Sequence, residues 1–147
     1  MRKILITGVA GLLGSRLADW IINNTNYKVV GIDDLSGGFS ENINRNVEFY
    51  KFNIIDLQAL KGVFEKENIE TVYHFAAYAA EGLSPFIRKY NYENNLIAST
   101  NLITCCIQHE ISRFVFASSM SVYGNKYEPP FNENLPQAPI DPYAVAK

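Results

Sequence analysis

Thr7-Gly8-Val9-Ala10-Gly11-Leu12-Leu13-Gly14 joins a short apolar run at residues 4–6 to an amphipathic run that ends at residue 22. Glycine at a strand-to-helix turn permits a tight bend and lets the backbone come close to a phosphate group. The helix that follows offers free N–H groups and the positive end of its dipole at the same point. The pattern predicts a site for the pyrophosphate of a dinucleotide, with a purely structural turn as the alternative.

Apolar runs alternate with amphipathic stretches along the rest of the chain. Strands are expected at residues 4–6, 29–32, 47–52, 72–75 and 114–117, and helices at residues 12–22, 57–67 and 86–108. Asp56 is the expected N-cap of the second helix, and Pro142 is expected to start a further one after a proline-rich loop. The strands are continuously apolar, which indicates a parallel sheet covered on both faces. The predicted fold class is α/β, a doubly wound parallel sheet of the Rossmann type, truncated after about five strands.

Length and composition favour one domain. The chain has 147 residues, 48% of them hydrophobic, which is enough for a single core. Its net charge is -2 and it has no basic run that could neutralise a row of phosphates, so nucleic-acid binding is not expected. No stretch approaches about 18 uninterrupted apolar residues, so membrane insertion is not expected either. The adjacent Cys105 and Cys106 cannot join distant elements, which favours a reducing cytoplasm.

Asp33 ends the second apolar run, about 20 residues after the glycines. A carboxylate at this place can accept hydrogen bonds from the hydroxyls of the adenosine ribose. Its charge would repel a 2′-phosphate. The expected cofactor is therefore NAD rather than NADP, and no metal site is expected.

Tyr143 and Lys147 are four residues apart and would share one face of a helix. A free phenol has a pKa of about 10, and a nearby ammonium favours its charged form, so the pair could act as a base. The alternative is an ordinary helix on which the pair is a coincidence. A hydroxyl-rich stretch at residues 118–124 follows the fifth strand, and a serine there could hydrogen-bond a reacting oxygen.

Together these motifs resemble the extended short-chain dehydrogenase/reductases, and most closely the NAD-dependent nucleotide-sugar epimerases and dehydratases of the UDP-glucose 4-epimerase-like branch. The resemblance rests on Thr7-Gly8-x-x-Gly11-x-x-Gly14, His74-Phe75-Ala76-Ala77, Asn94-Asn95, Ser118-Ser119-Met120-Ser121-Val122-Tyr123-Gly124 and Tyr143-x-x-x-Lys147. It implies a nucleotide-sugar substrate that is transiently oxidised at C4 by hydride transfer to bound NAD.

The resemblance also implies roles for individual residues. Tyr143 would be the catalytic base, Lys147 would hold the nicotinamide ribose and tune Tyr143, and Ser119 would bind the sugar oxygen. The implied cofactor-binding residues are Gly8, Gly11, Leu12, Leu13, Gly14, Asp33, Asp34, Ser36, Gly37, Asn53, Ile54, Phe75, Ala76, Ala77, Asn95 and Lys147.

Two of these positions depart from the family pattern. Asp34 stands where the family usually has Asn, and Asn53 stands where it commonly has an aspartate that contacts the adenine amine. Recognition of adenine is therefore expected to be altered. His74 lies inside an apolar strand, and a structural role is expected for it.

Three other activities within the family and one non-catalytic role stay open. A 4,6-dehydratase would carry an Asp-Glu pair where this chain has Met120 and Ser121, while a decarboxylase or a reductase stays possible. A non-catalytic NAD-binding domain would not need Ser119, Tyr143 and Lys147.

The family continues past the lysine with a substrate domain. The chain is therefore expected to be an N-terminal fragment, with residues 1–147 forming the NAD-binding Rossmann domain and inactive alone. A homodimer through the long helix is also implied.

Overall fold

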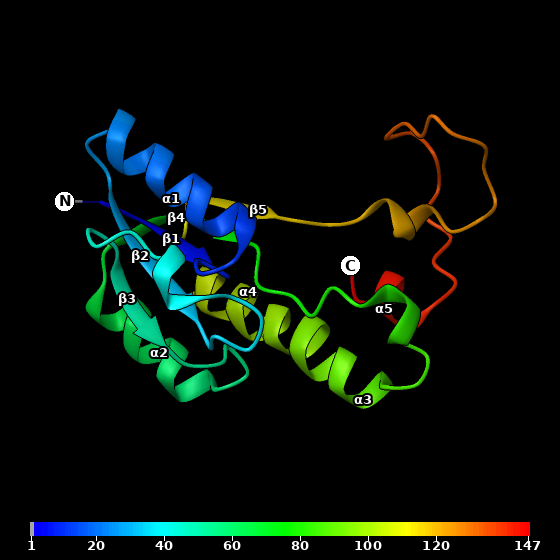
Figure 1. The fold of residues 1–147 in the computed structure, drawn as a ribbon, viewed down its shortest axis with the longest axis horizontal. Coiled ribbons are helices and arrows are strands. Elements are labelled where there is room, and N and C mark those ends of the chain that lie inside the picture. The colour runs from blue at the N-terminus through cyan, green and yellow to red at the C-terminus, as the bar shows by residue number, and fades with distance from the viewer. Residues whose placement is uncertain (1) are drawn as a thin grey trace.

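β1 (Lys3–Thr7) lies at the centre of a parallel sheet in the computed structural model, which describes residues 2–147 (Figure 1). Within these residues the sheet has five strands in the order β3-β2-β1-β4-β5, and every neighbouring pair is parallel. The other strands are β2 (Lys28–Asp33), β3 (Glu48–Lys51), β4 (Ile69–His74) and β5 (Arg113–Phe116). The strand order reverses between β1 and β4, which confirms the predicted doubly wound fold.

Helices cover both faces of the sheet, as the apolar strands predict. α1 (Leu12–Asn24) packs on one face, where Ala18 and Ile21 meet Ile4 and Ile6 of β1. α2 (Leu57–Lys66) and α4 (Ala98–Gln108) pack on the other face against a core that includes Leu5. Neighbouring residues of β1 therefore serve opposite layers, which explains why the strand is apolar throughout.

The long helix expected at residues 86–108 starts two residues later and changes character along its length. It consists of α3 (Arg88–Asn91), the π-helical segment η3 (Tyr92–Ile97) and α4. Residues before it are taken up by the 3₁₀ turn η2 (Glu81–Leu83) and by the bond from Phe86 N to Leu83 O. A π turn adds a residue to the helical repeat, and π turns are frequently found at functional sites.

Two helices begin at the residues that the sequence analysis predicts. Asp56 caps α2, since its Oδ1 accepts a hydrogen bond from Ala59 N at 3.0 Å. α5 (Pro142–Val145) begins at the expected proline and is capped by Asp141, whose Oδ1 accepts from Ala144 N at 2.8 Å. Side-chain caps of this kind satisfy N–H groups that a helix start leaves free.

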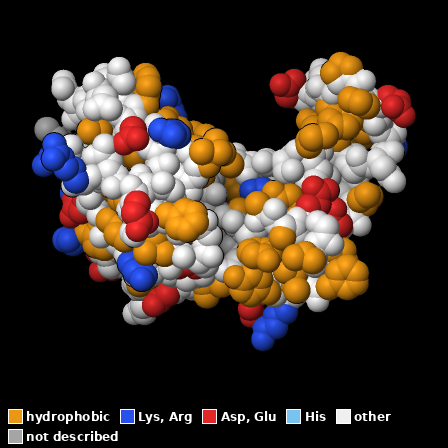
Figure 2. All heavy atoms as spheres, in the orientation of Figure 1, with side chains coloured by type: hydrophobic (Ala, Val, Ile, Leu, Met, Phe, Trp, Pro, Cys, Tyr) orange, Lys and Arg blue, Asp and Glu red, His pale blue; other side chains and the backbone are white. Residues whose placement is uncertain are grey.

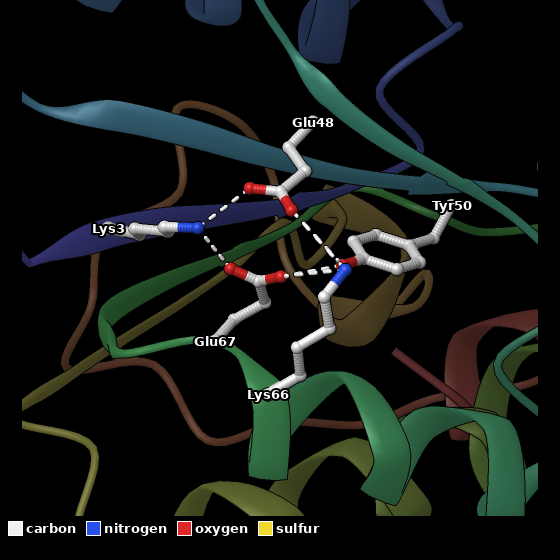
Figure 3. A network of polar contacts seen from close by, with 5 residues as sticks. All are labelled: Lys3, Glu48, Tyr50, Lys66 and Glu67. Carbon is white, nitrogen blue, oxygen red and sulfur yellow. Dashed lines mark hydrogen bonds and ion pairs between the residues drawn. The ribbon is translucent and has the colours of Figure 1, made fainter.

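Charged side chains join the amino ends of β1 and β3 to the end of α2 (Figure 3). Lys3 Nζ donates to Glu48 Oε2 at 2.7 Å and also to the buried carboxylate of Glu67. The Tyr50 hydroxyl donates to Glu67 and accepts from Lys66 Nζ at 2.6 Å. This network, called the amino-edge network below, lies opposite the edge where parallel sheets bind ligands, so we assign it to stability.

The segment after β5 leaves the sheet and forms a separate lobe. It passes through the short helix η4 (Met120–Tyr123) and a loop before returning at α5, and Figure 2 shows the surface hollowed between this lobe and the sheet body. A further short helix, η1 (Ser40–Asn42), follows β2. Among residues 2–147, no helix combines the length and the hydropathy that crossing a membrane requires.

Candidate cofactor and proton-transfer site

A cavity of about 450 Å³ opens at the carboxyl ends of β1, β2, β3 and β4. This is the edge at which doubly wound sheets bind nucleotides. Most of the residues expected to contact the cofactor lie in its wall, namely Gly8, Gly11, Asp33, Asp34, Ser36, Gly37, Asn53, Ile54, Phe75, Ala76 and Ala77. The wall also contains residues that the sequence analysis did not predict, including Phe52, Tyr78, Tyr90 and Asn94. Their positions just after strands or on the long helix could have indicated them.

The glycine turn forms the wall of the cavity next to β1. Gly8 has φ of 73°, and a Cβ there would lie 2.7 Å from Ala76 N, so only glycine fits. A Cβ on Gly14 would lie 2.1 Å from Gly8 O, which holds α1 tightly against the turn. A Cβ on Gly11 would lie 3.3 Å from Gly8 O, a tight contact, so a side chain there would crowd the turn. The turn fits a phosphate, because Gly11 caps α1 and leaves its first N–H groups free.

Asp33 stands at the end of β2 with its carboxylate held by two backbone donors. Ala10 N donates to Oδ2 at 3.0 Å and Leu35 N donates to Oδ1 at 2.8 Å. The first bond ties the carboxylate to the glycine turn, and the second ties it to the loop after β2. Each oxygen keeps a lone pair for a ligand hydroxyl, so the geometry fits a ribose.

Asp34, Asn53 and Asn94 form a hydrogen-bonded row in the same wall. Asn53 Nδ2 donates to Asp34 Oδ2 at 2.7 Å and to Asn94 Oδ1 at 3.0 Å. The row joins the loop after β2 to the end of β3 and to the long helix. The two positions that depart from the family pattern are therefore direct partners.

A buried polar chain supports the floor of the cavity. Ala76 N donates to Thr7 Oγ1 at 3.3 Å, Thr7 Oγ1 lies 2.6 Å from His74 Nδ1, and His74 Nε2 lies 2.8 Å from Ser99 Oγ. The Ser99 hydroxyl in turn donates to Asn95 O, so its oxygen accepts a hydrogen bond from His74 Nε2. His74 is thus a neutral imidazole that donates from Nε2 and accepts at Nδ1. Burial, together with the charge of Lys147, lowers the pKa of His74 to about 4.

Asn95 lies behind the cavity rather than in its wall. Its side chain accepts from Tyr78 N at 2.7 Å and donates to Tyr78 O at 3.0 Å, so it holds a lining residue in place. It also donates to Asn91, whose Nδ2 reaches Pro142 O at 2.9 Å. These bonds connect the cavity to the start of α5. The buried polar residues of the long helix were a signal for this connection that the sequence analysis used only for Asn95.

Leu12, Leu13 and Gly14 lie in the first turn of α1, and none of their side chains lines the cavity. Leu12 and Leu13 are 75% and 62% exposed. What they could offer a cofactor is their backbone N–H groups, which do not depend on the side chain.

Tyr143 and Lys147 lie side by side at the end of β5, outside the cavity wall. Lys147 Nζ lies 5.9 Å from the centre of the Tyr143 ring and 5.0 Å from that of Phe116, and it donates to Ala117 O. Burial lowers the pKa of the Lys147 ammonium. Ser118 Oγ donates to Lys147 O at 2.8 Å, which fixes the backbone as well.

Ser119 follows directly, at the start of η4. Its Oγ accepts from Ser121 N at 3.2 Å and lies 2.9 Å from Ser121 Oγ. The bond from Ser118 to Lys147 O places residues 118–124, called the serine loop below, at the same end of β5 as Lys147. Among residues 2–147, no group of three or more His, Cys, Asp or Glu side chains is placed to hold a metal ion.

The comparison with family models matches residues 4–147 to the NAD dependent epimerase/dehydratase family. The chain belongs to this family. Its cofactor is NAD, and the turn at Gly8 and Gly11 and the carboxylate of Asp33 fit that cofactor. This family is a family of enzymes.

Similar proteins include the UDP-glucose 4-epimerase of Bacillus subtilis, which is 34% identical over 98% of this chain and 44% of its own length. Among solved structures, a UDP-glucose 4-epimerase of Thermotoga maritima with UDP-glucose has a TM-score of 0.94 at 36% identity, covering 100% of this chain and 48% of that one. The Thermus thermophilus UDP-glucose 4-epimerase complex with NAD has a TM-score of 0.92 at 31% identity, covering 100% and 47%. The chain thus spans less than half the length of these proteins.

Proposed function

We propose that this chain is the cofactor-binding part of a nucleotide-sugar epimerase that acts at C4 of the sugar, as a UDP-glucose 4-epimerase does. The observation that carries the proposal is the arrangement of one sheet edge. The cavity of about 450 Å³ lies over β1 to β4, and the pair of Tyr143 and Lys147 lies at the end of β5 beside the serine loop. The similarity to named epimerases over almost the whole chain supports it.

In this proposal the glycine turn and the first N–H groups of α1 bind the pyrophosphate. Asp33 accepts hydrogen bonds from the adenosine ribose and repels a 2′-phosphate, which favours NAD over NADP. Phe75, Ala76 and Ala77 follow β4, and the two alanines leave room for the ribose and phosphates. Asn95 acts through Tyr78, which it holds by two hydrogen bonds.

Tyr143 is the proposed base, which takes the proton from the sugar 4-hydroxyl. Lys147 lies close enough to favour the negative phenolate, and its bond to Ala117 O keeps it at the sheet edge. Ser119 donates a hydrogen bond to the sugar oxygen as that oxygen loses its proton. The bonds from Ser121 N and Ser121 Oγ hold Ser119 for this role.

When bound, NAD would supply the reversible hydride transfer at C4 of the sugar, with no net oxidation over the whole reaction. Tyr143 returns the proton to the sugar oxygen in the second half of the reaction. A dehydratase needs a further acid and base for the loss of water, and Met120 and Ser121 can supply neither.

Calorimetric titration of the chain with NAD and with NADP tests the cofactor assignment. We expect saturable binding of NAD and at least tenfold weaker binding of NADP, a difference of about 1.4 kcal/mol. Binding of neither nucleotide would contradict the cofactor site, and equal binding of both would contradict the assignment of Asp33.

Incubation of the chain with NAD and UDP-glucose tests whether this part suffices for turnover. We expect no conversion, because the chain spans less than half of the epimerases that it resembles. Formation of UDP-galactose, an isomer of unchanged mass, would show that residues 1–147 are active by themselves. Loss of the mass of one water would instead indicate a dehydratase.

We further propose that the long helix mediates a homodimer and that the protein works in the cytoplasm. Ile103 and Ile107 of α4 are 43% and 73% exposed, and burying them against a second copy would remove apolar surface from water. The two cysteines are free thiols, which fits a reducing compartment. Light scattering that gives the mass of a monomer across micromolar concentrations would contradict the dimer.

A further inference from the structure

The direction in which a dinucleotide must lie follows from two landmarks. The pyrophosphate belongs at the glycine turn after β1, and the adenosine ribose belongs at Asp33, at the end of β2. The adenine base therefore lies one strand further, between the loop after β2 and the end of β3. The cavity wall in that region combines apolar and polar side chains, namely Phe52, Ile54, Asp34 and Asn53.

A count of hydrogen bonds identifies which polar atom can bind the base. Asn53 has no free donor, because Nδ2 spends its two hydrogens on Asp34 Oδ2 and Asn94 Oδ1. Its Oδ1 accepts from Ile55 N at 2.9 Å and keeps one lone pair, but this amide oxygen carries no net charge. Asp34 Oδ1 accepts two bonds, from Ser36 N and Ser36 Oγ. Asp34 Oδ2 accepts only from Asn53, so it keeps a lone pair and shares the negative charge.

We propose that Asp34 Oδ2, oriented by Asn53, is the acceptor that recognises the exocyclic amine of adenine and so selects an adenine dinucleotide. An ionised carboxylate can accept hydrogen bonds but cannot donate one. It therefore matches the amine of adenine, and it repels the carbonyl that hypoxanthine carries at the same ring position. A charge-assisted bond of this kind is stronger than the bond that a neutral amide would make.

This inference deepens the proposed cofactor site and rests on it. It assigns to Asp34 a specificity that the sequence leaves in doubt, since the carboxylate stands on the loop after β2 and the amide stands after β3. Asn53 donates to Asp34 at 2.7 Å. If the carboxylate and the amide exchanged positions, the hydrogen bond could still form, with the amide at residue 34 as the donor and the carboxylate at residue 53 as the acceptor.

The test compares the binding of NAD with that of nicotinamide hypoxanthine dinucleotide, which lacks the amine, by calorimetry. The wild-type chain is expected to bind NAD about tenfold more tightly. Asp34→Asn should reduce this preference to about twofold or less, because the acceptor is then neutral. The double variant Asp34→Asn/Asn53→Asp should restore the preference, because a carboxylate again faces the base.

Asp56→Asn is the matched control. It makes the same change of charge close to the cavity, outside its wall, and Asn caps a helix as well as Asp does. It should leave the preference at its wild-type value. Equal affinity of the wild-type chain for both dinucleotides, or a full preference in Asp34→Asn, would overturn the inference while the cofactor assignment survives. Failure of the chain to bind NAD at all would overturn both.

Discussion

His74 Nδ1 lies 2.6 Å from Thr7 Oγ1 in the centre of the sheet, where both side chains are almost fully buried. The contact joins β1, which leads into the glycine turn, to β4, which leads into Ala76 and Ala77. The other ring nitrogen reaches Ser99 on the long helix. A protonated ring would need acceptors on both sides, whereas Thr7 supplies a donor. The arrangement therefore requires a neutral histidine.

This requirement predicts how stability depends on pH. The pKa of His74 is lowered from 6.5 to about 4, so between these values the unfolded chain binds a proton that the folded chain refuses. Its contribution to stability is complete above pH 6.5 and is lost as the pH falls through this window, by about 3 kcal/mol in total. Urea unfolding at a series of pH values between 4 and 7 measures the slope.

The two histidines of the chain provide the variant and its control. His74→Gln should flatten the slope between pH 6.5 and 4, and it should lower stability at pH 7 by about 1 to 3 kcal/mol through the lost hydrogen bonds. His109→Gln removes an exposed ring and should leave both unchanged. A slope that persists in His74→Gln would assign the acid sensitivity to another group.

The amino-edge network predicts a second, lower pH window. Burial alone would raise the pKa of Glu67, but the bonds from Lys3 and Tyr50 outweigh it and lower the pKa from 4.5 to about 2. Its stabilising effect is present above pH 4.5 and is lost as the pH falls toward 2.

Glu67→Gln should destabilise the chain by about 2 kcal/mol at pH 7, because Lys3 then keeps only the partly exposed carboxylate of Glu48 as a charged partner. Glu48→Gln changes a carboxylate that is 41% exposed, and it should change stability by less than about 1 kcal/mol. The midpoint of urea unfolding of each variant measures the difference. Equal losses of stability in the two variants would mean that the burial of Glu67 does not strengthen its ion pair with Lys3.

The sequence predicted the strands, the fold class and most of the cavity wall because these depend on local features. The glycine turn, the apolar strands and the carboxylate at Asp33 each act through residues near them in the chain. The row of Asp34, Asn53 and Asn94 could not be predicted, since it joins three segments that only the folded sheet brings together. The π-helical segment also left no clear pattern, because one added residue merely rotates the apolar stripe.

Asp33 provides a direct test of cofactor selection. Asp33→Asn keeps the shape of the side chain and removes the charge that would repel a 2′-phosphate. NAD binding should weaken by about tenfold, since neutral acceptors bind the ribose hydroxyls less strongly, while NADP binding should weaken less or improve. The ratio of the two dissociation constants, measured by calorimetry, is the readout. An unchanged ratio would exclude Asp33 as the selecting residue.

Cys105 and Cys106 allow the link between cofactor binding and stability to be measured without a spectroscopic signal from the cofactor. Both thiols are buried. Burial raises the pKa of Cys105, and burial together with the neighbouring Cys105 raises that of Cys106 to about 12. Because the thiolate is the reactive form, iodoacetamide should label the folded chain only when it opens.

NAD should slow this labelling in proportion to the stability that it adds, about 2.7 kcal/mol at 100 times its dissociation constant, or about 100-fold in rate. NADP at the same concentration should slow it much less. Mass spectrometry of the labelled chain over time gives both rates. Fast labelling in native buffer would mean that the α4 face against the sheet opens readily, and labelling that NAD leaves unchanged would mean that the cavity does not bind it.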